Sequence, residues 1–258
     1  MLNTFEYTIT AAGPLSLDIH PAVGPASTDL GTVIYIHGGG FAVGDRATDA
    51  TRIDALASHG LNVVTPDYRL APGARFPDQV DDIVSTIMWV RDHLEIVGTT
   101  SPKIGLWGAS AGAVLAALAA LNAPAAQPRV EAVVSWFGFS DIATSASRSP
   151  LESAILPPGA ENALLGVEDL ASAPDLARQA SPLEHVHADA PPFLIAHGDR
   201  DHVVEPSESI QLHQALTRAG APSTLMLLGG AGHEDPRFDS ADNIAITAAF
   251  LRSHLAGT

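Results

Sequence analysis

The sequence predicts an α/β fold, with a mostly parallel, doubly wound sheet that is covered by helices on both faces. Short apolar runs alternate along the chain with longer amphipathic stretches, which is the pattern of strands that alternate with helices. The chain has 258 residues, of which 46% are hydrophobic, enough to bury the core of one large domain. We therefore expect a single domain over residues 1–258.

Two runs near the N-terminus, residues 5–10 and 15–20, read FEYTIT and LSLDIH and are separated by a Gly13-Pro14 turn signal. They predict an antiparallel hairpin at one edge of the sheet. The later strand candidates are rich in β-branched or other apolar residues, as expected for strands covered on both faces. These candidates are residues 31–37, 62–68, 103–108, 129–137, 192–198 and 223–228.

Helices are expected between these strands. From about Pro77 to Leu94 the apolar residues recur at helical spacing, and the intervening Asp81 and Asp82 are expected to face water. A last helix is indicated near the C-terminus by one apolar stripe, which consists of Ile244, Ala248, Leu251 and Leu255.

The segment from about Phe139 to Ala190 breaks this alternation. It is rich in Ala, Ser and Pro and holds only short helical patches such as NALLG. A structureless loop of this length is uncommon inside a compact domain. We therefore expect a small cap or lid at about 139–190, with a plain surface loop as the alternative.

The composition argues against several classes of function. The formal net charge of −16 repels nucleic-acid phosphates and anionic lipid surfaces, so neither is expected as a partner. The N-terminus lacks the basic and apolar regions of a secretory signal, and no apolar run is long enough to span a membrane, so we expect a cytoplasmic protein. The absence of cysteine removes thiol catalysis, disulfides and Cys-based metal sites, which favours a hydroxyl nucleophile.

Residues 108–112 read GASAG and match the G-x-S-x-G spacing around Ser110. This spacing is weak evidence by itself, but the run KIGLW before it predicts a strand and AGAVLAALAAL after it predicts a helix. A sharp strand-to-helix turn lifts a serine oxygen clear of the sheet and leaves backbone N–H groups free at the helix N-terminus. Ser110 is therefore the candidate nucleophile, against the alternative of an ordinary serine in a glycine-rich turn.

A serine nucleophile needs a base to remove its proton and hydrogen-bond donors to stabilise the oxyanion that then forms on the substrate. The run HGGGF ends a predicted strand, and its consecutive glycines let backbone N–H groups approach a ligand closely. A phosphate-binding loop and a flexible turn are the rival interpretations. The phosphate-binding loop is disfavoured because an apolar FAV run follows where such a loop has a lysine.

Five motifs resemble those of the α/β-hydrolase fold, and specifically the esterases related to hormone-sensitive lipase. In chain order they are HGGGF, DYRLAP at 67–72, GASAG, HG-x-x-D-x-x-V and GAGH at 230–233. Within that group the chain is most similar to small bacterial carboxylesterases and feruloyl or acetylxylan esterases. The resemblance covers nearly the whole chain and implies a triad in the order Ser, Asp, His. It also implies Ser110 as nucleophile and an oxyanion hole of the backbone N–H groups of Gly39, Gly40 and Ala111.

The candidate base is His233, because it lies in a glycine-rich loop directly after the last predicted strand. His37 is expected to hold the glycine loop in shape. His185 and His187 form an H-x-H pair, but no third metal ligand is apparent, so we expect neither a metal nor another cofactor.

Two aspartates in the run HGDRDHVV, Asp199 and Asp201, are candidates for the carboxylate that orients the base. Such a carboxylate fixes the imidazole tautomer whose other nitrogen accepts the serine proton. The family pattern HG-x-x-D-x-x-V places the acid at its fifth position, which is Asp201. Asp199 falls on a variable position and is interpreted as a turn residue that caps backbone N–H groups, although it stays the alternative acid.

Together these residues predict a serine carboxylic ester hydrolase, or carboxylesterase, that acts on short-chain acyl or aryl esters through an acyl-enzyme intermediate. An aryl formamidase or other amidase is one alternative, and a non-catalytic ligand-binding protein on the same fold is another. Phe41 and Trp136 are candidate substrate-binding residues, with Phe137 as the alternative to Trp136 and a place in the core as the other interpretation. The expected partner is a small-molecule ester, and the sequence does not distinguish a monomer from a homodimer.

Overall fold

The computed structural model describes residues 3–23, 30–122, 129–143 and 159–257. These residues form an eight-stranded sheet in the order β1-β2-β4-β3-β5-β6-β7-β8. The strands are β1 Asn3–Thr10, β2 Gly13–His20, β3 Thr32–Ile36, β4 Asn62–Pro66, β5 Ile104–Ala109, β6 Ala132–Trp136, β7 Phe193–Gly198 and β8 Ser223–Leu228.

The N-terminal hairpin lies at one edge of the sheet, as predicted. β1 pairs antiparallel with β2, and β2 pairs antiparallel with β4, whereas β4, β3, β5, β6, β7 and β8 run parallel. The turn lies two residues earlier than the Gly13-Pro14 signal indicates, at residues 11–12. Gly13 already belongs to β2, where its left-handed φ of 123° starts the return strand.

The central strands are covered on both faces. Every residue of β3, β4, β5, β6 and β7 is buried. Because neighbouring strand residues point to opposite faces, Ile34 and Ile36 of β3 pack into one core while Val33 and Tyr35 pack into the other. This burial on both sides explains why these strands appear in the sequence as continuous apolar runs.

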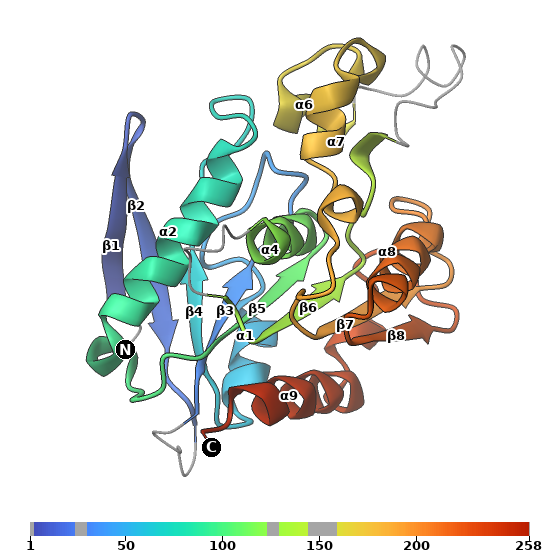
Figure 1. Ribbon diagram of the computed structural model, residues 1–258. Helices are drawn as coiled ribbons and strands as arrows, with labels where there is room; N and C mark the ends of the chain where they lie inside the picture. Colours follow the sequence, from blue (N-terminus) through green and yellow to red (C-terminus); the bar gives the residue numbers. More distant parts are fainter. Residues whose placement is uncertain (1–2, 24–29, 123–128, 144–158, 258) are drawn as a thin grey trace.

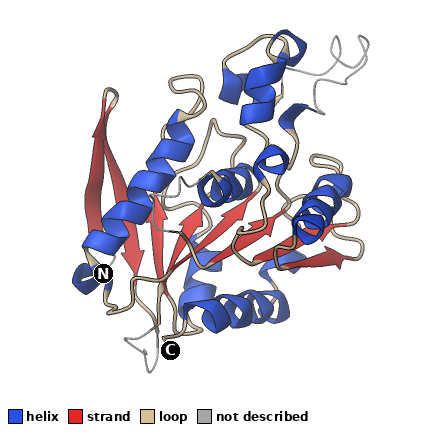
Figure 2. Cartoon of the chain, viewed as in Figure 1, coloured by secondary structure: helices blue, strands red, loops and turns tan. Residues whose placement is uncertain are grey.

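Two layers of helices enclose the sheet (Figures 1 and 2). One core is closed by α2 Asp78–Asp92, α4 Ala111–Leu121 and α8 Pro206–Ala219. The other is closed by α1 Ala50–Ala57 and α9 Ala241–Leu255, and the one-turn α3 Leu94–Val97 follows α2. Within the described part of the chain, none of these helices combines the length and apolar character needed to cross a membrane.

One expectation for α2 is wrong, because Asp82 does not face water. It is 2% exposed, and its carboxylate accepts hydrogen bonds from Nε of Arg69 at 2.9 and 3.1 Å and from Nη2 at 2.8 Å. A buried carboxylate of this kind needs a paired cation to replace its lost hydration. The pair ties the DYRLAP segment, residues 67–72, to α2.

The segment that breaks the strand–helix alternation forms several short helices. These are α6 Ala160–Leu165, η2 Leu170–Ser172, α7 Pro174–Gln179 and η3 Pro182–His185. Figure 1 shows α6 and α7 projecting beyond the layers of the sheet. The middle of the predicted cap, residues 144–158, lies outside the described residues, so the cap at about 139–190 stays a prediction.

Gly112 at the start of α4 provides a test of how closely this helix approaches β3. A Cβ at this position would lie 2.0 Å from the carbonyl oxygen of Ile36, a backbone atom that cannot move aside. Gly112→Ala should therefore lower the free energy of unfolding by about 1–3 kcal/mol, measured by urea denaturation, although alanine favours helices. Gly229→Ala is the matched control, because a Cβ there meets nothing within 4 Å. Equal stability of the two variants would contradict this packing.

Candidate active site

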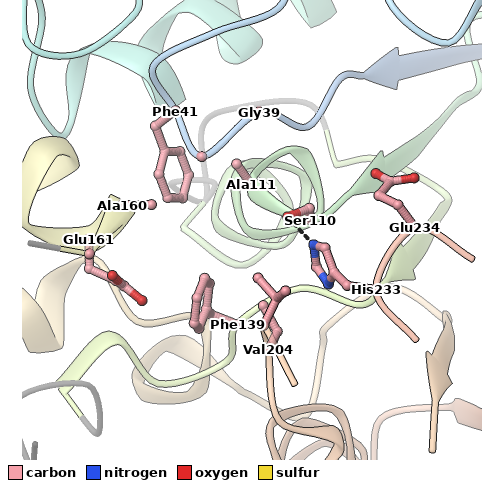
Figure 3. Close-up of a pocket in the computed structure, with 13 residues that line it drawn as sticks. Gly39, Phe41, Ser110, Ala111, Phe139, Ala160, Glu161, Val204, His233 and Glu234 are labelled. Carbon is pink, nitrogen blue, oxygen red and sulfur yellow. Dashed lines mark hydrogen bonds between the residues drawn. The ribbon is translucent and has the colours of Figure 1, made fainter. Parts of the chain in front are cut away.

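Three loops at the carboxyl ends of parallel strands bring Ser110, Asp201 and His233 together. Ser110 follows β5, Asp201 follows β7, and His233 follows β8. Nε2 of His233 lies 2.9 Å from Oγ of Ser110, and Nδ1 lies 2.7 Å from Oδ2 of Asp201. Figure 3 shows the imidazole directed at the serine. Because an ionised carboxylate only accepts hydrogen bonds, Nδ1 carries the proton and Nε2 is free to accept one from Ser110.

The backbone at Ser110 makes a sharp turn between β5 and α4. Its dihedral angles are φ 52° and ψ −120°, and α4 begins at the next residue, Ala111. The Ser110 N–H donates to the carbonyl oxygen of Trp136 at 2.9 Å, which anchors the turn to β6. A positive φ is strained for a residue with a side chain, and such strain is found at functional sites. The predicted strand–turn–helix around GASAG is therefore present.

Asp201 is held by donors on both carboxylate oxygens. Oδ1 accepts from the N–H groups of Val203 and Val204 at 2.8 and 3.0 Å, and Nε2 of His197 lies 3.2 Å from Oδ2. Burial raises the pKa of Asp201, but hydrogen bonds from the two histidines and the two backbone N–H groups outweigh it and hold the pKa well below its usual value. The carboxylate is thus ionised at neutral pH, as an acceptor for His233 requires.

Asp199 lies in the same loop but has a different partner. Its side chain is exposed and accepts a hydrogen bond from the N–H of Gly230, in the loop between β8 and His233. Of the two candidate acids, Asp201 contacts His233, whereas Asp199 hydrogen-bonds to the backbone of the loop that precedes His233.

The glycine loop after β3 lies against the turn at Ser110. Gly39 has φ 107°, and a Cβ on it would lie 2.1 Å from the carbonyl oxygen of Val43, so only glycine fits. Within the described ranges, no group accepts a hydrogen bond from the backbone N–H of Gly39, Gly40 or Ala111. All three residues line the cavity at Ser110. Free donors beside a nucleophile are what an oxyanion hole requires.

The side chains of His37 and Tyr68 hold the glycine loop in place. Nδ1 of His37 lies 2.7 Å from the carbonyl oxygen of Gly38, and the His37 ring stacks on Tyr68 with centroids 4.3 Å apart. The Tyr68 hydroxyl donates to the carbonyl oxygen of His37 at 3.1 Å. Burial lowers the pKa of His37, which favours the neutral ring. Tyr68 belongs to the DYRLAP motif, which gave no indication from sequence that it would support the glycine loop.

A cavity of about 380 Å³ opens over Ser110 and His233. Phe41, Phe139, Ala160, Glu161 and Val204 line one side of it, and Glu234 lies on the far side of the serine and histidine (Figure 3). Phe41 thus lines the cavity, and its contact with substrate stays a prediction. Glu161 and Glu234 carried no sequence signal that pointed to the cavity.

Trp136 is not among the described residues that line this cavity. It is fully buried in the core on the α1 and α9 side, with its ring centroid 4.8 Å from that of Trp107. The expectation that Trp136 contacts substrate is therefore replaced by its alternative, a place in the core. Its neighbour Phe137 sets its ring edge-on to His233, with centroids 4.9 Å apart. Strand residues alternate in direction, and this apolar run gave no indication of which residue faces the site.

Among the residues that the structure describes, His185 and His187 have no third metal ligand beside them. Nε2 of His185 lies 2.8 Å from the carbonyl oxygen of Gln179. Within the described residues, no group of three or more His, Cys, Asp or Glu side chains is placed to hold a metal ion.

The low pKa of Asp201 predicts how stability depends on pH. A carboxylate whose pKa is lower in the folded state contributes stability above its unfolded pKa of about 4, and this contribution fades as the pH falls towards the folded value. Asp201→Asn should therefore be less stable than the unmodified protein at pH 7, with a smaller difference near pH 3, in urea titrations. Ser110→Ala removes no charge and should differ by the same amount at both pH values. A difference for Asp201→Asn that does not change with pH would contradict the shift.

Comparison with known proteins shows the family to which the chain belongs. The sequence model of the BD-FAE family matches residues 17–216. Esterase LipQ of Mycobacterium tuberculosis is 31% identical over 199 residues, which cover 73% of this chain and 46% of the relative. Esterase LipC of the same organism is 32% identical, over 81% of this chain and 54% of the relative. An acetyl esterase of Salmonella paratyphi B is 30% identical, over 81% and 66%. The chain thus spans about half the length of LipQ and LipC.

Solved structures of esterases share the fold. An esterase from Pyrobaculum calidifontis is 26% identical with a TM-score of 0.78, over 100% of this chain and 86% of that one. A truncated carbohydrate esterase from gut microbiota has a TM-score of 0.83 at 24% identity, over 98% and 96%, which shows the fold alone. The family match covers most of the chain, and the sheet order and strand-end loops are those of an α/β hydrolase. The chain belongs to the BD-FAE family, with the α/β-hydrolase fold of esterases.

Proposed function

We propose that the protein is a serine carboxylic ester hydrolase that acts on short-chain acyl or aryl esters through an acyl-enzyme intermediate. One observation carries this proposal: Ser110, His233 and Asp201 form an unbroken line of hydrogen-bonding atoms, with separations of 2.9 and 2.7 Å. The named relatives, two of them esterases and one an acetyl esterase, support the same reaction class.

In the first half of the reaction, Oγ of Ser110 attacks the ester carbonyl carbon while Nε2 of His233 takes its proton. Asp201 keeps Nδ1 protonated and stabilises the imidazolium that forms. The carbonyl oxygen becomes an oxyanion and accepts hydrogen bonds from the backbone N–H groups of Gly39, Gly40 and Ala111. His233 then gives its proton to the leaving alcohol oxygen, the C–O bond breaks, and the acyl group stays on Ser110.

The second half reverses these roles, with water in place of the alcohol. His233 removes a proton from the water as the water attacks the acyl carbon. The second oxyanion rests on the same three N–H groups, and its collapse breaks the bond to Ser110. The serine recovers its proton from His233 and the carboxylic acid leaves, so the enzyme needs no cofactor for this sequence.

The lining of the cavity supports a small substrate. Its volume of about 380 Å³ is at the low end for small-molecule sites, and Phe41, Phe139, Ala160, Val203 and Val204 give it an apolar wall. Gly159, Ala160 and Glu161, at the start of α6, form part of that wall. Their position supports the proposal that residues 139–190 act as a cap over the site.

Ser110→Ala tests the nucleophile. We expect kcat on a chromogenic acetate ester to fall by about 10⁶-fold, because the other groups cannot form the acyl-enzyme. A fluorophosphonate should label the unmodified protein at Ser110, as shown by peptide mass spectrometry, and should leave the variant unlabelled. Retention of most activity in the variant would refute the proposal. Faster turnover of N-formyl aromatic amides than of esters would instead favour the formamidase, and an unlabelled, inactive protein would favour a binding function.

The paired variants Asp201→Asn and Asp199→Asn test the acid. Asp201→Asn would present an amide to His233 and favour the wrong tautomer, so kcat should fall by about 10⁴-fold. Asp199 contacts the loop backbone alone, and its variant should lose far less. The reverse ranking in steady-state assays would move the acid to Asp199 and leave Ser110 and His233 in place.

A further inference from the structure

Arg52 lies beneath the candidate site with its charge enclosed by protein. It belongs to α1, between the glycine loop and β4, and its side chain is 4% exposed. Its guanidinium lies over the ring of Trp136, 5.0 Å from the centroid. An arginine on a short amphipathic helix would ordinarily point to water, because its charge is costly to bury. Its inward orientation therefore requires strong partners.

The partners of Arg52 lie in the segment that follows His233 and in the part of the chain around the glycine loop. Nε donates to Oδ1 of Asp239 at 2.6 Å, and Nη2 donates to Oδ2 of Asp239 at 3.1 Å and to Oε2 of Glu234 at 3.0 Å. Nη1 donates to the hydroxyl of Tyr35 at 3.0 Å and lies 3.7 Å from Oδ2 of Asp49. Four of the five guanidinium N–H groups are thus used within the described structure.

These contacts hold both ends of the segment that follows His233. Glu234 is the next residue along the chain, and Asp239 ends the short helix η4, Pro236–Asp239. Glu234 has a left-handed φ of 52°, which is unfavourable for a residue with a side chain. The ion pair with Arg52 is an interaction that can hold this backbone in place. The strained residue therefore fixes the direction in which the chain leaves the histidine.

The remaining contacts reach the strand that leads to the glycine loop. Tyr35 lies in β3, two residues before His37, and its hydroxyl donates to Oδ2 of Asp49 at 2.6 Å while accepting from Arg52. Arg52 therefore links the histidine loop to β3 and to the start of α1. Glu234 and Tyr35 are 199 positions apart in the chain, yet they meet at one guanidinium group.

We propose that Arg52 is a positioning residue, which holds His233 in line with Ser110 by fixing residues 234–239 against β3 and α1. This inference rests on the proposed serine-hydrolase mechanism, in which the alignment of Nε2 of His233 with Oγ of Ser110 sets the rate of acylation. Displacing a catalytic group by about 1 Å costs on the order of 100-fold in rate. The contacts of Arg52 with Glu234 and Asp239, which we call the clamp, hold the residue adjacent to His233 and thereby act on that alignment.

The positive charge of Arg52 also stabilises the clamp, because it balances the negative charges of the surrounding carboxylates. Asp49, Glu234 and Asp239 place three carboxylates around one guanidinium, so their mutual repulsion would spread the cluster if the cation were removed. Burial lowers the pKa of Arg52, but the hydrogen bond to Asp239 and the nearby acidic groups outweigh it and raise the pKa above its usual value. Arg52 therefore remains charged at neutral pH.

Arg52→Lys keeps the charge but removes the planar fork, which makes it the most informative variant. A lysine has a single nitrogen and cannot reach Tyr35, Glu234 and Asp239 together. We expect kcat on the acetate ester to fall by about 10- to 100-fold, with KM changed by less than about threefold, since a group is misplaced and no substrate contact is removed. The rate at which a fluorophosphonate labels Ser110 should fall in parallel, because labelling uses the same Ser110–His233 pair.

Arg91→Lys is the matched control. The Arg91 guanidinium also makes two hydrogen bonds, to the carbonyl oxygens of Pro102 and Arg129, but these residues precede β5 and β6 and lie at the end of the sheet opposite the candidate site. This variant should lower the free energy of unfolding while its kcat, measured on fully folded protein, stays within about threefold of the unmodified enzyme. The comparison separates loss of alignment from a general loss of stability, which would affect both variants alike.

Asp239→Asn provides a second variant in case Arg52→Lys does not fold. It weakens the ion pair between Arg52 and η4 and leaves Arg52, Glu234 and the residues that line the cavity unchanged. We expect a fall in kcat of about tenfold with an unchanged KM. The inference would be overturned if folded Arg52→Lys had the same kcat and labelling rate as the unmodified enzyme. If Arg52→Lys does not fold, the same result for folded Asp239→Asn would overturn it.

Failure of the proposed function would have a different signature. In that case the unmodified protein would neither hydrolyse the ester nor react with the fluorophosphonate. An active, labelled protein whose clamp variants match it in rate would overturn the role of Arg52 and leave the serine-hydrolase proposal standing.

Discussion

The tight crossing of β5 and α4 at Ser110 is the constraint on which the site depends. Ser110 adopts φ 52° and ψ −120°, and a Cβ on Gly108 would lie 2.2 Å from the carbonyl oxygen of Gly112. Gly112 in turn lies against the carbonyl oxygen of Ile36, the last residue of β3. The glycine loop begins at the next residue, so one close approach of three backbones positions both Ser110 and the free N–H groups beside it. Larger residues at either glycine would separate them.

The sequence carries enough information to predict the strands, the turn at Ser110 and the contact between Asp201 and His233. In a parallel sheet all carboxyl ends lie at the same edge, so chain position alone predicts that loops after β5, β7 and β8 converge. The apolar runs locate those strands to within a few residues because a strand covered on both faces is a continuous run of β-branched and other apolar residues. The choice between Asp201 and Asp199 came from a family pattern, and the hydrogen bond to His233 supports it.

Sequence reasoning fails for charged helix residues that have buried partners. Periodicity wrongly assigned Asp82 to water and gave no prediction for Arg52, yet both are buried. Their burial depends on partners that no local pattern reveals: Glu234 and Asp239 are more than 180 positions from Arg52. Trp136 shows the complementary limit, because a strand buried on both faces has no polar alternation to say which side chain faces the site. Long-range pairing and strand facing both require the assembled structure.

The ion pairs of Arg52 also bear on the chemistry of a histidine base in an acidic protein. The net charge is −16, and two carboxylates lie near His233. Asp201 hydrogen-bonds to it, and Glu234 is the next residue in the chain. An unpaired carboxylate beside the ring would compete with Asp201 for the hydrogen bond from Nδ1. Glu234 instead directs its carboxylate to Arg52, so Asp201 is the described carboxylate that hydrogen-bonds the ring. The same guanidinium that we propose holds the loop in position thereby directs a competing hydrogen-bond acceptor away from His233.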